Sequence, residues 1–248
     1  MEYESLLEVV KDWIKREKYV SITSIQKSFS VGFVTASKVF NALIDDGLIE
    51  KDKTYLKGNK VIGFNIGLKI YLLDMNAGIV NAWKEVFKDN EEITIIHDTF
   101  RNFMDNHKDI ECVVSPANAY GIMNGGYDLA ISEYFGNNLQ HIVQRYIKKN
   151  LYGEQPVGSS IIVDIPNTNK KLIHTPTMQI PSLIKDDFLI YQCMRTTLIK
   201  ALENNVKSIV IPAFGGCCGG LSPKIISKRM KEAYEQIRTS SKVHCSNL

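Results

Sequence analysis

Two glycine-rich loops hold the residues of this sequence that are best suited to chemistry. The first loop follows the apolar pair Val113-Val114 and runs from Ser115 into a predicted helix. Its Gly125-Gly126 pair stands at the helix entrance, where backbone N–H groups and the helix dipole favour an anion. Asp128 lies in the first turn of that helix, and Asn118 adds an amide side chain to the loop. The loop therefore predicts a phosphate site with a carboxylate beside it.

The second loop runs from Pro212 to Gly220, again after an apolar strand and again before a helix. Its sequence is PAFGGCCGG, in which four of the last six residues are glycine. The backbone N–H groups of such a loop can form a nest for phosphate. The GGxxGG spacing matches neither a Walker loop nor a dinucleotide fingerprint. Two loops of this kind, each between a strand and a helix, predict a clamp on a diphosphate.

The elements that must position these loops alternate between strand and helix. Apolar runs predict strands at Lys69–Leu73, Ile93–His97, Cys112–Ser115, Ser160–Asp164, Leu172–Thr175 and Ser208–Pro212. Helical spacing predicts helices at Ala77–Phe87, Tyr127–Phe135, Leu139–Lys149, Phe188–Asn204 and Ile225–Ile237. This alternation predicts an α/β fold with a mixed or mostly parallel sheet and helices on both faces. Ligands of such sheets bind at the carboxyl ends of the strands, where both loops fall.

The first loop resembles a known family. Val114–Ile131 resembles the first binding loop of macrodomains, whose pattern is a hydrophobic strand, NAAN, a glycine pair, a hydrophobic residue and Asp. Asn118 falls on the second Asn of that pattern, Gly125-Gly126 on the glycines and Asp128 on the Asp. Ser115-Pro116 stands where the family has its first Asn and the next residue, which departs from the pattern.

Two further motifs appear in the family's order. Ile95–Thr99 is similar to the family's strand that ends in Asp-Ile/Val-Thr, and Gly216–Gly219 is similar to its second, diphosphate-cradling loop. The resemblance spans Leu68 to Ile237 and implies a macrodomain over residues 67–248, preceded by a small domain over residues 1–66. It also implies that the macrodomain binds ADP-ribose, with no cofactor and no metal.

The resemblance also implies a role for each residue of the site. Asp98 would accept a hydrogen bond from the adenine amine with help from the Thr99 backbone, while Asn118 and Asp128 would face the distal ribose. In a hydrolase of ADP-ribosyl bonds, Asp128 would orient or deprotonate the attacking water and Asn118 would fix the ribose hydroxyls. The remaining ligand-binding residues lie on the two loops: Gly125, Gly126, Tyr127, Gly215, Gly216, Cys217, Cys218 and Gly219.

Three readings of the function remain open. An ADP-ribosyl hydrolase is favoured by the Asn118/Asp128 pair. A non-catalytic sensor that passes its signal to the N-terminal domain is favoured by Tyr127, which is larger than usual, and by Cys218, which stands where the hydrolytic branch has an aromatic. A structural or interaction module is the third reading. Asp128 is also a common type of first-turn helix residue, and Asp98 is a common type of turn residue.

Residues 1–66 have a different pattern. Helical spacing predicts a first helix through Ile14, a second capped by Thr23 or Ser24, and a third around Ala36–Ile44, with a tight turn at Ser30–Gly32. Two strand candidates follow, at Leu48–Glu50 and Val61–Phe64, joined by a basic connection. These features predict a winged helix-turn-helix. Ser21–Lys53 is similar to the winged-helix gamma domain of the chromosome translocase FtsK.

The N-terminal pattern predicts duplex DNA as a second partner. Polar residues of the third helix and nearby lysines would contact phosphates and base edges: Lys27, Thr35, Ser37, Lys38, Asn41, Lys51 and Lys53. Residues 1–66 carry ten Lys/Arg and nine Asp/Glu, so the segment is close to neutral. A winged helix used for dimerisation or protein contacts therefore remains an alternative.

Composition excludes several classes of protein. The chain has 248 residues, of which 44% are hydrophobic and 23% charged, which is typical of a soluble globular protein. No apolar run approaches the roughly 20 residues that span a bilayer, and the acidic, amphipathic N-terminus does not resemble a signal peptide, so we expect a cytoplasmic protein without membrane contact. The five cysteines form no CxxC pair and no Cys/His cluster with zinc spacing, which argues against a disulfide framework and a zinc site.

Overall fold

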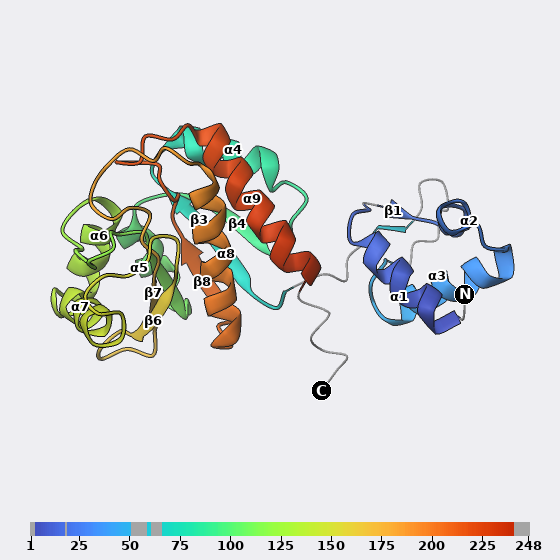
Figure 1. Cartoon of the computed structure of the whole chain (residues 1–248), viewed down its shortest axis with the longest axis horizontal. Coiled ribbons are helices and arrows are strands. Elements are labelled where there is room, and N and C mark those ends of the chain that lie inside the picture. Colours follow the sequence, from blue (N-terminus) through green and yellow to red (C-terminus); the bar gives the residue numbers. More distant parts are fainter. Residues whose placement is uncertain (1–2, 18, 51–58, 61–65, 241–248) are drawn as a thin grey trace. The chain divides into compact units, whose positions relative to one another are not determined.

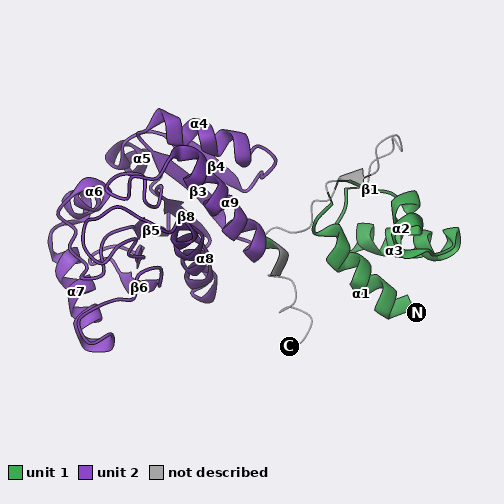
Figure 2. Cartoon of the chain, turned by 45° about the horizontal axis from the view of Figure 1, so that its top comes forward, with its two compact units in different colours: residues 1–66, 238–248 green, residues 67–237 purple. Residues whose placement is uncertain are grey.

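The chain forms two compact units. The computed structural model describes residues 3–17, 19–50, 59–60 and 66–240. Residues 1–66 and 238–248 belong to the first unit, and Gly67–Ile237 form the second (Figure 2). Each unit has a hydrophobic core of its own, as expected of separate domains.

Three helices build the first unit: α1 (Tyr3–Ile14), α2 (Ile22–Phe29) and α3 (Phe33–Asp45). Their apolar faces bury one another, with Val10, Ile25 and Leu43 fully inside. The second helix is capped by Ser21 rather than by Thr23 or Ser24. The Ser21 Oγ accepts a hydrogen bond from the Ser24 backbone N–H at 3.1 Å, and the Ser24 Oγ accepts one from the Ser21 N–H at 2.9 Å. This reciprocal capping box fixes the start of α2 two to three residues earlier than predicted.

A short antiparallel ladder accompanies the three helices. It joins β1 (Tyr19–Val20) to β2 (Asn59–Lys60), with Val20 opposite Asn59. The sequence predicted strands elsewhere. Within Leu48–Glu50 only Ile49 forms a β-bridge, and the predicted strand Val61–Phe64 lies outside the described residues.

A six-stranded sheet forms the centre of the second unit. Its strands are β3 (Lys69–Asp74), β4 (Ile93–His97), β5 (Cys112–Ser115), β6 (Ile161–Asp164), β7 (Lys171–His174) and β8 (Ser208–Ile211). The order across the sheet is β4-β3-β8-β5-β7-β6. The first five strands in this order are parallel, and only β6, at the edge, runs antiparallel to its neighbour. The mixed, mostly parallel sheet that the sequence predicted is confirmed.

Helices cover both faces of this sheet (Figure 1). On one face lie α5 (Phe100–Asn106), α6 (Gly126–Phe135) and α7 (Asn138–Asn150), whose core cluster includes Phe103, Ile131 and Val143. The other side carries α4 (Ala77–Val86), α8 (Phe188–Glu203) and α9 (Pro223–Ser240), with Trp83 and Tyr234 buried. Five of these six helices were predicted to within a few residues. The seven-residue α5 was missed.

The parallel strands place one set of loops at one edge of the sheet. The segments that follow β4, β3, β8, β5 and β7 all leave the sheet at its carboxyl edge, because these five strands run in the same direction. Both glycine loops and Asp98 therefore share this edge. No helix in the described part of the chain has the length and apolar character needed to cross a membrane.

Candidate functional site

The two glycine loops leave the sheet from neighbouring strands. Strands β5 and β8 pair in parallel, with Val113 opposite Val210. The first loop begins at the end of β5 and the second at the end of β8, so both start at the same edge. This is the geometry that a clamp on a diphosphate requires.

Asn118 shapes the first loop with its side chain. The Oδ1 atom accepts hydrogen bonds from the backbone N–H groups of Tyr120, at 3.1 Å, and Ile122, at 3.3 Å. The Nδ2 atom donates to the Ile122 carbonyl at 3.0 Å. The Asn118 side chain, which the resemblance assigns to the distal ribose, therefore already holds the loop and has one N–H left to give.

Residues on two helices hold the rest of the first loop. The Met123 N–H donates to Gln140 Oε1 at 2.8 Å, and the Met123 carbonyl accepts a hydrogen bond from Ser132 Oγ at 3.1 Å. Gly121 has a φ of 65°, and a Cβ there would lie 2.8 Å from Val143 Cγ1. The first loop is thus fixed by side-chain hydrogen bonds and by one close approach to α7.

Asp128 is held by a serine at the end of β5. The Ser115 Oγ donates a hydrogen bond to Asp128 Oδ1 at 2.6 Å. Burial raises the pKa of Asp128 to about 7, although the hydrogen bond from Ser115 acts in the opposite direction. The carboxyl group therefore changes its protonation state close to neutral pH. Ser115 was not among the predicted site residues, but its position at the first Asn of the family pattern was a usable signal.

The N-terminus of α6 is exposed and has no side-chain cap. Its cap residue is Gly125, which offers no side-chain cap, and Gly126 has a φ of 55°. Both are exposed, and neither has a neighbouring atom within 4 Å of the position of a Cβ. Tyr127 instead packs into the core, with its ring edge-on to Phe100 at 5.3 Å. Its hydroxyl is buried without a hydrogen-bond partner in the described part of the chain.

The second loop is shaped by its glycines. A Cβ on Gly219 would lie 2.7 Å from the Gly215 carbonyl oxygen, and a Cβ on Gly215 would lie 2.8 Å from Ile184 Cδ1. The Ile184 N–H donates to the Gly219 carbonyl at 3.0 Å, so the underside of the loop is covered. Cys217 and Cys218 are exposed on the outer side.

Asp98 and Thr99 connect β4 to α5. Asp98 Oδ1 accepts hydrogen bonds from the Thr99 N–H at 2.7 Å and from Asn102 Nδ2 at 3.1 Å. The Thr99 side chain caps α5 by accepting from the Asn102 N–H at 3.2 Å. Asp98 thus uses Oδ1 to hold the start of the helix, and within the described residues its Oδ2 atom accepts no hydrogen bond.

Asp74 is a third acid at this edge, and the sequence analysis missed it. It ends β3, which lies between β4 and β8, and its Oδ1 atom accepts a hydrogen bond from the Asn76 backbone N–H at 2.7 Å. Burial raises the pKa of Asp74 above its usual range. Because β3 pairs in parallel with β8, Asp74 stands at a strand end beside the start of the second loop. The available signal was an acid at the end of an apolar strand, as at Asp98.

The Macro domain family model matches residues 114–230 of this chain. These residues belong to the Macro domain family. The match begins at the last residues of β5 and includes both glycine loops with Asp128, while Asp74 and Asp98 precede it.

Several relatives and solved structures are similar to the chain. An uncharacterized protein of Aquifex aeolicus is 27% identical over 125 residues, which are 50% of this chain and 72% of that one. A structure of the Oceanobacillus iheyensis macrodomain with ADP is 22% identical and covers 52% of this chain and 70% of its own, with a TM-score of 0.47. The macrodomain of Mycobacterium tuberculosis DarG is 22% identical and covers 53% of this chain and 85% of its own, with a TM-score of 0.46.

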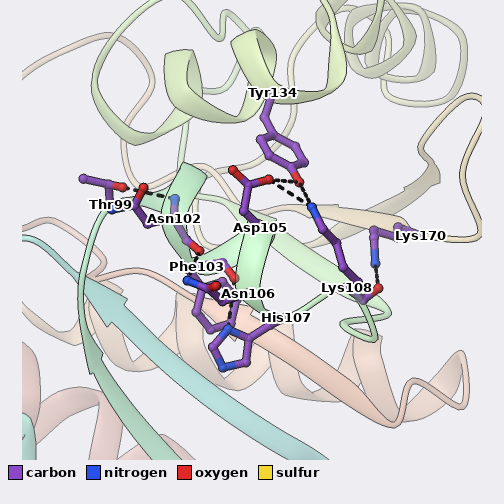
Figure 3. Close-up of polar contacts among 9 residues, drawn as sticks. All are labelled: Thr99, Asn102, Phe103, Asp105, Asn106, His107, Lys108, Tyr134 and Lys170. Carbon is purple, nitrogen blue, oxygen red and sulfur yellow. Dashed lines mark hydrogen bonds and ion pairs between the residues drawn. The ribbon is translucent and has the colours of Figure 1, made fainter.

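A polar cluster at the C-terminal end of α5 connects this helix to α6 and to the segment before β7. Tyr134 and Lys108 both point toward Asp105, whose carboxylate accepts from them at 3.0 and 2.9 Å (Figure 3). These two hydrogen bonds lower the pKa of Asp105. Lys170 Nζ donates to the Lys108 carbonyl at 2.7 Å. The cluster lies at the opposite end of α5 from Thr99, so it supports the site from a distance.

Two histidines at strand ends also have structural partners in the macrodomain. His97 Nε2 donates to the Met75 carbonyl at 2.9 Å. His174 Nδ1 donates to Gln155 Oε1 at 2.7 Å, and burial lowers the pKa of His174 to about 3. His174 therefore stays neutral across the physiological range.

A separate cavity of the macrodomain lies beside the start of α8. Its volume is about 400 Å³, and its lining includes Thr177, Leu183, Ile184 and Gln192. None of the predicted site residues lines it. Across the described residues, no group of three His, Cys, Asp or Glu side chains could hold a metal ion.

The predicted DNA contacts lie mainly on one face of α3. Lys38 and Asn41 are exposed, and Thr35 and Ser37 flank them as half-buried residues. Lys27 is exposed on α2. The other two predicted DNA contacts, Lys51 and Lys53, lie outside the described residues.

Proposed function

We propose that the macrodomain binds ADP-ribose along the carboxyl edge of its sheet. The observation that carries this proposal is the pair of glycine loops on the neighbouring strands β5 and β8. Backbone N–H groups of two adjacent loops can bind two linked phosphates, and the open N-terminus of α6 adds its dipole. Membership of the Macro domain family supports the same ligand through the family resemblance.

The order of groups along the edge gives the ligand a direction. Asp98 lies beyond β4, at one end of the row, and has Oδ2 left to accept a hydrogen bond from the adenine amine. Asp128 lies beyond β5, on the other side of the second loop, where the distal ribose would reach. The diphosphate then crosses the two glycine loops. AMP, which lacks the second phosphate and the distal ribose, would use only part of this surface.

Calorimetric titration of the full chain tests this proposal. ADP-ribose should give a saturable heat, and AMP should bind much more weakly. Absence of saturation with ADP-ribose at millimolar concentration would reject the proposal.

We further propose that the macrodomain hydrolyses an ADP-ribosyl linkage with Asp128 as its acid–base group. Water would attack the anomeric carbon of the distal ribose and break its bond to the acceptor. A carboxyl group with a pKa of about 7 can take the proton of that water and return it to the leaving group at neutral pH. Ser115 orients this carboxyl through its 2.6 Å hydrogen bond. The remaining N–H of Asn118 would then fix a ribose hydroxyl.

A second candidate is a non-catalytic sensor of an ADP-ribose derivative. The Asn118 side chain favours it, because three of its hydrogen bonds already hold the first loop. Release of free ADP-ribose from ADP-ribosylated protein and from ADP-ribosylated DNA separates the two candidates. A chain that binds ADP-ribose but releases none from either substrate is the sensor.

For the first unit we propose contact with duplex DNA through the exposed face of α3. Lys38 would neutralise a phosphate and Asn41 could reach a base edge. Exposed Phe33 and Val34 lie on the same helix and favour protein contact as the alternative.

A further inference from the structure

The outer face of α7 is basic. The spacing of its exposed basic residues places them on one side of the helix: His141, Arg145, Lys148 and Lys149. No Asp or Glu occurs from Asn138 to Asn150. Over residues 67–237 the Lys/Arg and Asp/Glu residues are equal in number, eighteen of each. This face is therefore a local separation of charge within a domain that is neutral as a whole.

The described part of the chain offers this face no ionic partner. Arg145, Lys148 and Lys149 form no ion pair and no side-chain hydrogen bond there. Glu154, the first acid after α7, instead accepts a hydrogen bond from Gln179 Nε2 at 2.8 Å. The helix dipole favours Lys148 and Lys149 in the last turn, but it does not account for Arg145. Like charges four residues apart, as at Arg145 and Lys149, destabilise a helix, and an external anion would remove this repulsion.

A tyrosine directly after α7 is fully exposed. The Tyr152 side chain is 100% exposed, and its φ of 55° lies in the left-handed region, which bulky residues rarely adopt. The turn is closed by the backbone, because the Gly153 N–H donates to the Ile147 carbonyl at 3.2 Å. Glycine would suit this position better than tyrosine. The ring thus contributes no packing to the fold and is free to stack on a ligand.

We propose that the outer face of α7, together with Tyr152, binds single-stranded nucleic acid. The basic side chains would contact successive phosphates and the Tyr152 ring would stack on a base, a combination that binds single strands without sequence preference. The bases of a duplex are already stacked on each other, so they would not reach this ring. A membrane surface fits less well, because the exposed large apolar side chains of this stretch are Tyr146 and Tyr152, with no Leu, Phe or Trp.

The inner side of α7 packs on the first glycine loop. A Cβ on Gly121 would lie 2.8 Å from Val143 Cγ1, and the Gln155 N–H, just after the helix, donates to the Ala119 carbonyl at 2.9 Å. The outer face takes no part in these contacts, and α7 lies at the periphery of the second unit (Figure 1). Substitutions on the outer face should therefore leave the first loop and its ligand binding unchanged.

Fluorescence anisotropy of the full chain with a labelled dT strand of about 20 nucleotides tests the proposal, since this probe forms no duplex. Binding should be measurable at about 50 mM salt and should weaken as salt is added. Lys148→Ala/Lys149→Ala should reduce the slope of log K against log salt by about 1.4 units, because each phosphate contact of a single strand contributes about 0.7. Lys84→Ala/Lys88→Ala is the matched control, which removes two exposed lysines on the other side of the sheet and should not change binding.

Tyr152→Asn separates stacking from charge. This change removes the ring and introduces a residue that adopts the left-handed conformation readily. Affinity for the dT strand should fall by about 5- to 100-fold, the effect of losing one stacked base, while the salt slope stays the same. Tyr152→Phe should keep the wild-type affinity. Lys38→Ala, which addresses the proposed duplex site of the first unit, should leave binding of the dT strand unchanged.

Four results would overturn the proposal. They are no binding of the dT strand by the full chain at about 50 mM salt, equal salt slopes in the α7 and α4 variants, loss of binding in Lys38→Ala, and equal affinities of Tyr152→Asn and wild type. The last result would reassign the face to an acidic protein surface, for which stacking is not needed. Thermal melting verifies that each variant is folded, and no outcome depends on the binding of ADP-ribose.

Discussion

The two glycine loops of the macrodomain are held by opposite means. Side chains fix the first loop: Asn118 spans it, Gln140 and Ser132 hold Met123, and Ser115 holds Asp128 where the loop enters α6. The second loop is fixed by the absence of side chains. Its glycines pack against each other and against Ile184, at distances that leave no room for a Cβ.

This difference assigns different tasks to the two loops. The first loop carries a titratable carboxyl group and the bonds that aim it, so side-chain substitutions there should alter chemistry. The second loop would contribute only backbone N–H groups and a closely packed shape, so a single added methyl group there should alter ligand binding.

The largest effect is expected at Asp128. Asp128→Asn keeps an acceptor for Ser115 but removes acid–base chemistry, so turnover of an ADP-ribosylated substrate should fall by about 10²-fold or more. Affinity for ADP-ribose should remain within a small factor of the wild-type value. Release of ADP-ribose is followed chromatographically and affinity by calorimetry. Full turnover in Asp128→Asn would place the chemistry outside the first loop.

The same carboxyl group should make stability depend on pH. The pKa of Asp128 is raised from 3.8 to about 7, so its contribution to stability is fully present below pH 3.8 and is lost as the pH rises through 7. Asp128→Asn lacks this loss. Its free energy of unfolding relative to wild type should therefore rise between pH 4 and pH 8, by on the order of 2–4 kcal/mol. Urea unfolding at several pH values measures this, and parallel curves for the two proteins would show that the pKa of Asp128 is not raised in the folded chain.

An added methyl group tests the second loop. Gly219→Ala forces the loop apart, because the new Cβ would meet the backbone of Gly215 at 2.7 Å. Overpacking of this kind costs about 1–3 kcal/mol, which corresponds to a loss of up to roughly 100-fold in affinity for ADP-ribose. Gly32→Ala is the matched control, since no atom lies within 4 Å of its added Cβ. Equal affinities of the two variants would mean that the shape of the second loop does not determine binding.

The smallest effect is expected in the first unit. Lys38→Ala should weaken binding of duplex DNA and reduce the dependence of log K on log salt concentration by about one unit, because one phosphate contact is lost. ADP-ribose affinity should not change, since neither loop involves this helix. Gel-shift titrations at several salt concentrations provide the measurement. Failure of the wild-type chain to bind any duplex at about 50 mM salt would favour the protein-contact alternative.

Much of the architecture could be predicted from the sequence, because apolar strands and amphipathic helices have clear periods. The short α5 was missed since its seven residues give too little periodic signal and its start depends on the Asp98–Thr99 cap. The insertion of β3 between β4 and β8 has no local signal at all. Asp74 stands beside the start of the second loop only because of that insertion, so the sequence did not identify it as a site residue.

The sequence was sufficient to locate the two loops of the site, but not to predict the hydrogen bonds within it. Glycine spacing identified both loops. The hydrogen bond between Ser115 and Asp128 joins residues thirteen apart in the chain and depends on how α6 packs on β5. The use of the Asn118 side chain within its own loop likewise depends on the path of the backbone.

Amide spectra of the full chain, labelled with ¹⁵N and titrated with ADP-ribose, test the central claim most directly. Glycine amides fall in a distinct region of such spectra, so both loops can be followed together. If the two loops jointly hold a diphosphate, the signals of Gly125 and Gly126 and those of Gly215 and Gly216 should shift along one binding curve, while Gly32 and Gly47 of the first unit stay in place. Shifts confined to one loop, or no shift in either, would contradict the account.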